Sequence, residues 1–266
     1  MAKGLDAISQ LIQEEAKSDR PKSRLSYLKK NQSIRVRIPE DILDNLHVYK
    51  VVEVFQKINQ TLSYSAEGRP ERDLYAEAHE LMKQDHAAGK ADGSIDPNDK
   101  DAYRESMILQ PKPIILFGVI PLTDFVTQGS KPKTFEAGQP LLLQTNLGKD
   151  NANIDALTQA LKKPTNANKF AKRAFEITCI ANNKYSFAVV DDEDLTADEK
   201  KVLEETAGAT IPDEVFDNAL FESTTEKQIA DLASIGFSIS RLQGFENAGQ
   251  ETPDEPSDIT SDDLPF

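Results

Sequence analysis

Aromatic and basic side chains stand close together in the segments 47–58, 103–112 and 169–187, and two arginines alternate with apolar residues over 33–38. Rings on which splayed bases stack, together with cations that neutralise phosphates, are what a protein needs to bind single strands without sequence preference. The interleaving therefore predicts a groove for single-stranded DNA. The candidate DNA-binding residues are Arg35, Arg37, Tyr49, Lys50, Tyr103, Arg104, Lys112, Lys172, Arg173, Lys184, Tyr185 and Phe187.

Each ring also has a purely structural interpretation. Tyr49 and Tyr185 neighbour lysines and fit either a stacking or a core role. A slip of one residue in strand register exchanges the two faces of a strand, so the sequence does not decide which rings face a groove. The phenylalanines that fit a buried core better than a stacking surface are Phe55, Phe117, Phe175 and Phe187.

The net charge of −14 opposes binding to a polyanion, but the charges are segregated along the chain. Residues 17–37 contain eight Lys and Arg residues and one acid. Residues 191–231 contain fourteen acids and three lysines, and residues 242–266 contain seven acids and no base. Because affinity for nucleic acid depends on local clusters of Lys and Arg, this distribution is compatible with a basic groove on an acidic protein.

The chain ends in Asp262, Asp263, Leu264, Pro265 and Phe266, after a segment rich in acids, Pro, Ser and Thr. Such a composition cannot bury enough apolar surface to order itself. The tip resembles that of bacterial single-stranded-DNA-binding proteins. That resemblance implies docking of the terminal ring and carboxylate into an apolar, basic-rimmed pocket on replication or repair proteins. The simpler alternative is a solubilising tail.

The elements that must position these residues are mainly strands. Alternating or apolar runs predict strands at 33–38, 47–58, 111–122 and 139–145 and a hairpin over 174–190. Helical spacing predicts helices at 5–16, 74–83, 154–163, 195–208 and 213–235.

This order of elements predicts an α+β, mainly β fold, namely an OB-type Greek-key barrel with a helical insertion and C-terminal helices. Another α+β sandwich is the alternative. We expect an N-terminal helix and basic arm over 1–30, an OB core over 31–241 with its insertion at about 65–105, and a disordered acidic tail over 242–266.

The layout of the body resembles the single-stranded-DNA-binding proteins of T-even-like bacteriophages. The resemblance rests on the basic arm, on Ile34 to Pro39, on Tyr103 to Val119 and on the late strand pair. It implies an OB-fold, cooperative DNA binding with self-association through the arm, and tail contacts to replication proteins. The groove candidates that it implies are Arg35, Arg37, Tyr103, Arg104, Tyr185 and Phe187.

One departure from that family concerns its zinc site. Its insertion is held by His and Cys ligands, whereas residues 65–105 here contain no Cys. We therefore expect no metal and an insertion that folds by helix packing, through residues such as Leu74, Leu81 and Met82.

The sequence gives no positive sign of catalysis. It lacks phosphate-binding glycine loops, and its nucleophiles lack a recognisable base partner, so we expect no enzyme and no cofactor. No run approaches the length of a membrane span, no signal peptide is visible, and the single Cys179 fits a reducing compartment. We expect a cytoplasmic protein, in the bacterial host if it is viral.

Two other functions fit parts of the pattern. An acidic protein that mimics DNA, or an adaptor for a nucleic-acid enzyme, would explain the acidic block over 191–231. The basic cluster over 17–37 argues against it, since a mimic gains nothing from these bases. A strand-annealing or recombination-mediator protein would also bind single strands.

Overall fold

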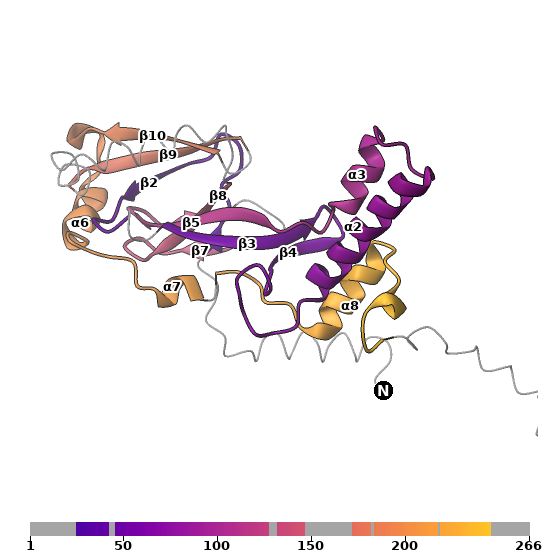
Figure 1. The fold of residues 1–266 in the computed structure, drawn as a ribbon. Helices are drawn as coiled ribbons and strands as arrows, with labels where there is room; N and C mark the ends of the chain where they lie inside the picture. The colour runs from indigo at the N-terminus through magenta and orange to yellow at the C-terminus, as the bar shows by residue number, and fades with distance from the viewer. Residues whose placement is uncertain are drawn as a thin grey trace, which may run out of the picture. The chain divides into compact units, whose positions relative to one another are not determined.

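The chain divides into two compact units. The computed structural model describes residues 25–42, 46–127, 132–146, 172–181, 184–217 and 219–245. Unit 1 comprises residues 1–49 and 113–221, and unit 2 comprises residues 50–112 and 222–266. Together the described residues have the α+β class expected from the sequence, with long strands and several helices (Figure 1).

Unit 1 is built on a sheet in which the strand order is β1-β8-β5-β2-β9-β10. The pair β1–β8 is parallel and the other neighbours along this path are antiparallel. Within the described residues β1 and β10 are not paired, so no closed barrel is present there. The strands are β1 (Leu25–Ser26), β2 (Ser33–Arg37), β5 (Lys112–Pro121), β8 (Leu141–Asn146), β9 (Ala174–Ala181) and β10 (Lys184–Val190), with a separate pair β6 (Phe125–Val126) and β7 (Thr134–Phe135).

The core of unit 1 follows from the period-two pattern of these strands. Ile34 and Val36 of β2 are buried and pack with Phe117 of β5 and with Phe175 and Ile177 of β9. The expected burial of the apolar positions of β2 is therefore confirmed. Phe117 and Phe175 are core residues, as their sequence context indicated.

One expected strand is two strands. The segment 47–58 forms β3 (Leu46–Val54) and the start of β4 (Ile58–Leu62), which pair antiparallel. The Lys57 N–H donates to the Val54 carbonyl at 3.0 Å, and Gln56 takes a left-handed backbone with φ of 59°. The sequence signal was missing because Gly, Asn or Asp usually occupies such a position. The β3 strand passes from unit 1 to unit 2 after Tyr49.

Unit 2 combines the β3–β4 hairpin with helices from distant parts of the chain. Asp73 begins α2 by accepting a hydrogen bond from the Ala76 N–H, and Gly93 ends the helix with a left-handed backbone. The predicted helical segment 74–83 is thus confirmed and extends further. The helices are α2 (Leu74–Asp92), α3 (Lys100–Ser106), α8 (Thr225–Ser234) and the short η2 (Ile239–Arg241), and Figure 1 shows α2, α3 and α8 side by side.

A buried polar network fastens α8 to α2. The Tyr75 hydroxyl donates to the Asp231 carboxylate at 2.7 Å, and Lys227 pairs with the same carboxylate from one turn earlier in α8. The Gln228 side chain accepts from the Leu74 N–H at 2.7 Å. Because Tyr75 and Asp231 are both buried, water could not replace either hydrogen-bond partner if the other were removed. The apolar part of this core includes Leu74, Leu109, Leu232 and Leu242, with Leu81 and Met82 packed against it.

The C-terminal helices differ from expectation in one respect. The segment 213–235 is not a single helix but two, α7 (Glu214–Asp217) and α8, and Thr224 caps the second by accepting from the Lys227 N–H. The preceding region forms η1 (Asp192–Asp194) and α6 (Ala197–Glu205), the second of which lies within the expected helix at 195–208. In α6, Thr196 and Glu199 form a reciprocal capping box.

Some predictions concern residues outside the described part of the chain. These are the helices at 5–16 and 154–163, most of the arm over 1–30, and the tail beyond Phe245. Within the described residues, no helix is long and apolar enough to cross a membrane.

His79 lies on the buried face of α2, and its Nδ1 has no hydrogen-bond partner among the residues that the structure describes. Burial lowers the pKa of His79, and the Lys83 charge lowers it further. Glu80 and a hydrogen bond to the Ser106 backbone act in the opposite direction without reversing the shift. The folded protein therefore favours the neutral ring.

This shift predicts how stability depends on pH. A histidine with a lowered pKa contributes stability above its ordinary value of about 6.5, and the contribution is lost as the pH falls towards the folded-state value. Urea unfolding between pH 7 and about 5.5, above the range in which most carboxylates titrate, should show a falling free energy of unfolding. His79→Gln should flatten this slope. Equal slopes in the two proteins would contradict the assignment.

Candidate nucleic-acid interface

The pairing of β2, β9 and β10 decides which predicted groove residues share a face. Arg35 is opposite Glu176, which is opposite Ala188 on β10. Phe187 is opposite Ile177, which is opposite the core residue Ile34. Since successive residues of a strand point to opposite faces, Phe187 lies on the core face and Arg35 on the other. The two do not form one groove.

The positions next to Arg35 on its own face carry no aromatic ring. One row consists of Ser33, Thr178 and Ser186, and the Ser33 and Thr178 hydroxyls are hydrogen bonded at 2.8 Å. The next row consists of Arg35, Glu176 and Ala188. These rows cannot stack bases, so Arg35 has no stacking ring beside it in the rows formed with β9 and β10.

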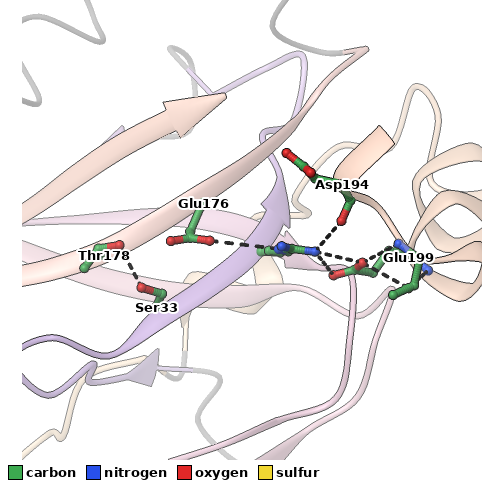
Figure 2. Close-up of polar contacts among 7 residues, drawn as sticks. Ser33, Glu176, Thr178, Asp194 and Glu199 are labelled. Carbon is green, nitrogen blue, oxygen red and sulfur yellow. Dashed lines mark hydrogen bonds and ion pairs between the residues drawn. The ribbon is translucent and has the colours of Figure 1, made fainter. Parts of the chain in front are cut away.

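Arg35 contacts Glu176, Asp194 and Glu199, the partners that are labelled in Figure 2. Its Nη1 donates to the Asp194 carbonyl at 2.9 Å and to Glu199 Oε2 at 3.1 Å. Its Nε lies 3.9 Å from the Glu176 carboxylate. The guanidinium thus joins β2 to β9 and to the start of α6, and its charge is balanced by two acids.

Glu199 is the buried end of this arrangement, with its side chain only 5% exposed. Burial alone would raise the pKa of its carboxyl and is the largest single influence. Hydrogen bonds from the Thr196 N–H and hydroxyl, together with Arg35, outweigh burial and lower the pKa below its ordinary value. The carboxylate is therefore ionised and depends on Arg35 for its countercharge.

Arg37 is buried beneath α6 and is also unsuited to a groove. Its Nε donates to Thr206 Oγ1 at 3.0 Å and its Nη2 donates to the Leu203 carbonyl. Burial lowers the pKa of the guanidinium, and Glu40 partly opposes this. Arg37 borders a cavity of about 510 Å³ in which bases and acids are mixed, with Lys172, Lys200, Glu40, Asp192 and Glu204 among its lining residues.

Tyr185 and Phe187 belong to the core of unit 1, which corrects their expected role as groove residues. Tyr185 is only 2% exposed, and its hydroxyl donates to the Gln144 carbonyl at 2.9 Å. Its ring meets Phe117 edge to face at 5.9 Å between centroids. Burial raises the pKa of its hydroxyl far above the ordinary value. Phe187 packs on the same cluster and is partly buried.

The other candidates in unit 1 are at least partly exposed. Tyr49 is half-buried and stacks on His47 at 6.2 Å, and His47 stacks on Phe216 at 3.9 Å. Lys172 and Arg173 are exposed immediately before β9, and Lys184 is the half-exposed first residue of β10. The Tyr49 ring is therefore partly used in packing against His47, while the three basic side chains remain accessible.

The candidates in unit 2 are all exposed. Tyr103 is 53% exposed, and its edge meets His86 at 6.0 Å. Arg104 pairs with Asp101 at 2.9 Å but keeps 75% of its side chain exposed. Lys50 is held on β3 by a hydrogen bond from its N–H to the Glu67 carboxylate at 2.7 Å. Lys112 is exposed at the start of β5.

Phe55 is a residue that was predicted to be buried and is exposed. Expected in the core, it is 84% exposed in the β3–β4 turn, next to the exposed Gln56 and Lys57. The sequence contained a signal for this exposure. Val52 and Val54 are the buried positions at the end of the strand, so the alternation places residue 55 on the exposed side, next to the polar residues Gln56 and Lys57. Tyr27, 48% exposed, was not among the candidates at all.

Two observations on the described residues bear on chemistry other than binding. Within the described ranges, no group of three or more His, Cys, Asp or Glu side chains could hold a metal ion. Cys179 is buried, and burial raises the pKa of its thiol, so it is not an activated nucleophile. The tail residues Asp262, Asp263, Leu264, Pro265 and Phe266 lie outside the described residues.

Comparison with known proteins does not distinguish among the functions that the sequence suggests. No protein-family model, no curated protein and no solved structure matches this chain. The resemblances to phage and bacterial single-stranded-DNA-binding proteins stay predictions.

The contacts of Arg35 predict a structural rather than a DNA-binding role. Arg35→Ala leaves the buried Glu199 carboxylate without its countercharge, so the free energy of unfolding should fall by about 1–3 kcal/mol. Oligonucleotide affinity, measured per folded molecule, should stay unchanged. Lys201→Gln, which removes an exposed charge from α6, is the matched control and should alter neither property. A large loss of affinity with unchanged stability in Arg35→Ala would overturn the structural role.

Proposed function

We propose that this chain binds single-stranded DNA without sequence preference, and that the β3–β4 turn of unit 2 is a principal contact. The observation that carries the proposal is the exposure of Phe55, 84% open to solvent in a tight turn with Lys57 beside it. An exposed ring offers a face to any unpaired base, and such stacking contributes about 1–3 kcal/mol per base.

The turn fixes the backbone that carries this ring before any ligand arrives. The hydrogen bond from the Lys57 N–H to the Val54 carbonyl closes the turn, and the buried Val54 and Ile58 anchor both strands in the core of unit 2. A backbone that is already closed into a turn loses less conformational freedom on binding than a flexible loop. This favours a recognition role over incidental exposure.

The charges near the ring are mixed. Lys57 and Lys50 are exposed on the hairpin, and so is Glu53. We therefore expect stacking to dominate the binding energy at this tip. Other exposed Lys and Arg residues of unit 2 would also contact the phosphates. Arg104 and Lys112 are the candidates for that role, and the exposed Tyr103 ring beside Arg104 offers a further stacking face.

Two further parts of the proposal come from the sequence. One is an OB-type Greek-key core, for which the antiparallel path through β5, β2, β9 and β10 gives partial support. The other is the acidic tip Asp262–Phe266, which would recruit replication or recombination proteins through charge-assisted contacts and burial of the terminal ring. We further propose self-association along DNA through the N-terminal arm.

A second candidate function is an acidic DNA mimic or adaptor. It is favoured by one observation: Asp191, Asp192, Glu193 and Asp194 are all exposed, while Arg35 and Arg37 are neutralised or buried inside unit 1. Such a protein would bind a nucleic-acid enzyme and not DNA itself.

Titration of labelled oligo-dT and a matched duplex, followed by fluorescence anisotropy over a range of salt, separates the two functions. We expect tight single-strand binding that Phe55→Ala weakens about 5- to 150-fold. Phe221→Ala, which removes a half-exposed ring from unit 1, is the matched control and should bind normally. Binding that survives Phe55→Ala unchanged would remove the turn from the interface. No oligo-dT binding at low salt would favour the mimic.

The tail gives a separate prediction. With seven acids and no base after Phe245, it should compete with DNA for basic surfaces, so its removal should tighten DNA binding at low salt. The deletion should begin after Phe245, because Leu242 is buried in the core of unit 2 and Arg72 contacts both Gln243 and Phe245. Equal affinity of the shortened and full chains at low salt would refute competition.

A further inference from the structure

The segment Tyr27–Gln32 of unit 1 is a rigid basic turn. The Gln32 N–H donates to the Lys29 carbonyl at 2.9 Å, and the Gln32 side chain accepts from the Lys29 N–H at 3.0 Å. Asn31 has a left-handed backbone with φ of 67°, a conformation that Asn tolerates better than most residues. Two hydrogen bonds close the turn from opposite sides, so its shape is set independently of ligand.

The same turn is fastened to the sheet. The Asn31 N–H donates to the Cys179 carbonyl at 2.7 Å, and the Cys179 N–H donates to the Gln32 carbonyl at 3.0 Å. Leu28 is buried in the core of unit 1. The turn therefore stands near the end of β9 as an extension of the sheet.

Tyr27 presents an aromatic ring beside this turn. Its hydroxyl donates to Gln144 Oε1 at 3.4 Å, and Gln144 is itself buried on β8. Tyr27 is nevertheless 48% exposed. The tip of the side chain is thus held while part of its apolar surface faces solvent, an arrangement suited to stacking on a flat partner.

The charges beside Tyr27 are basic. Lys29 and Lys30 are exposed, and within the described residues neither ammonium group has an ion-pair partner. Lys184 begins β10 opposite Ala181, next to the part of β9 that holds the turn. Lys29 and Lys30 differ in this respect from Arg35, whose charge is balanced by Glu176 and Glu199.

We propose that the Tyr27–Gln32 turn is a second contact for single-stranded DNA, with the Tyr27 ring stacked on a base and Lys29 and Lys30 neutralising phosphates. The proposal rests on the proposed function and adds a site on unit 1 to the Phe55 turn of unit 2. A single strand fits better than a duplex, because stacking on a side chain requires an unpaired base.

The chain contains no tryptophan, which makes a direct test possible. Tyr27→Trp keeps an aromatic ring at the site and introduces a single reporter, whose emission should be quenched when oligo-dT is added but not when a matched duplex is added. Phe221→Trp places the same reporter at another half-exposed aromatic position of unit 1, beside Glu222, and should not be quenched.

The lysines are tested through the salt dependence of binding. Each phosphate contact contributes about 0.7 to the slope of log affinity against log salt for single strands, so Lys29→Gln/Lys30→Gln should make the slope shallower by about 1.4. Lys200→Gln/Lys201→Gln changes the net charge equally on the acidic helix α6 and should leave the slope unchanged.

The outcomes separate this inference from the function on which it rests. Suppose that the native chain binds oligo-dT and Phe55→Ala weakens binding, but the Tyr27→Trp variant is not quenched and both lysine double variants have the native slope. The second contact is then wrong and the function stands. Equal quenching by duplex would also overturn the single-strand contact. If the native chain binds no oligo-dT at low salt, the proposed function itself fails.

Discussion

The ion pair between Arg35 and Glu199 is the constraint around which unit 1 is organised. A carboxylate that is 5% exposed can stay ionised only because Arg35 and the Thr196 cap replace the water it has lost. The pair connects β2 to the first turn of α6 over a sequence separation of 164 residues. Arg37 reinforces the connection through the carbonyl of Leu203 near the end of the same helix. The basic residues of β2 therefore serve the fold.

This use of the basic strand limits where the proposed nucleic-acid contacts can lie. One face of β2 packs on the apolar core, and the other is occupied by the contacts of Arg35 and Arg37. The interleaving of basic and aromatic residues therefore does not create a groove along this sheet. Phe55 and Tyr27 are instead exposed at turns, where each stands beside lysines. Turns can expose such side chains without leaving a face of the sheet unpacked.

The sequence predicted the features that depend on local patterns. The alternation of Ile34 and Val36, the apolar run of β5, the hairpin of β9 and β10 and the core of α2 all follow from periodicity. It could not predict the pairing of Arg35 with Glu199, because no local signal connects residues so far apart in the chain. The faces of Tyr185 and Phe187 were equally undetermined, since they depend on register. The turn at Gln56 was missed because its left-handed backbone lacks Gly or Asn.

The two proposed contacts would act together through the flexibility of the ligand. Phe55 lies in unit 2 and Tyr27 in unit 1, and each turn is fixed to its own core by hydrogen bonds and buried neighbours. A single strand bends readily, so one bound contact raises the effective concentration of the strand at the other. Two modest stacking sites can then produce tight binding without a continuous groove. A duplex offers neither unpaired bases nor comparable flexibility, so the same arrangement would discriminate against it without any clash being built into the protein.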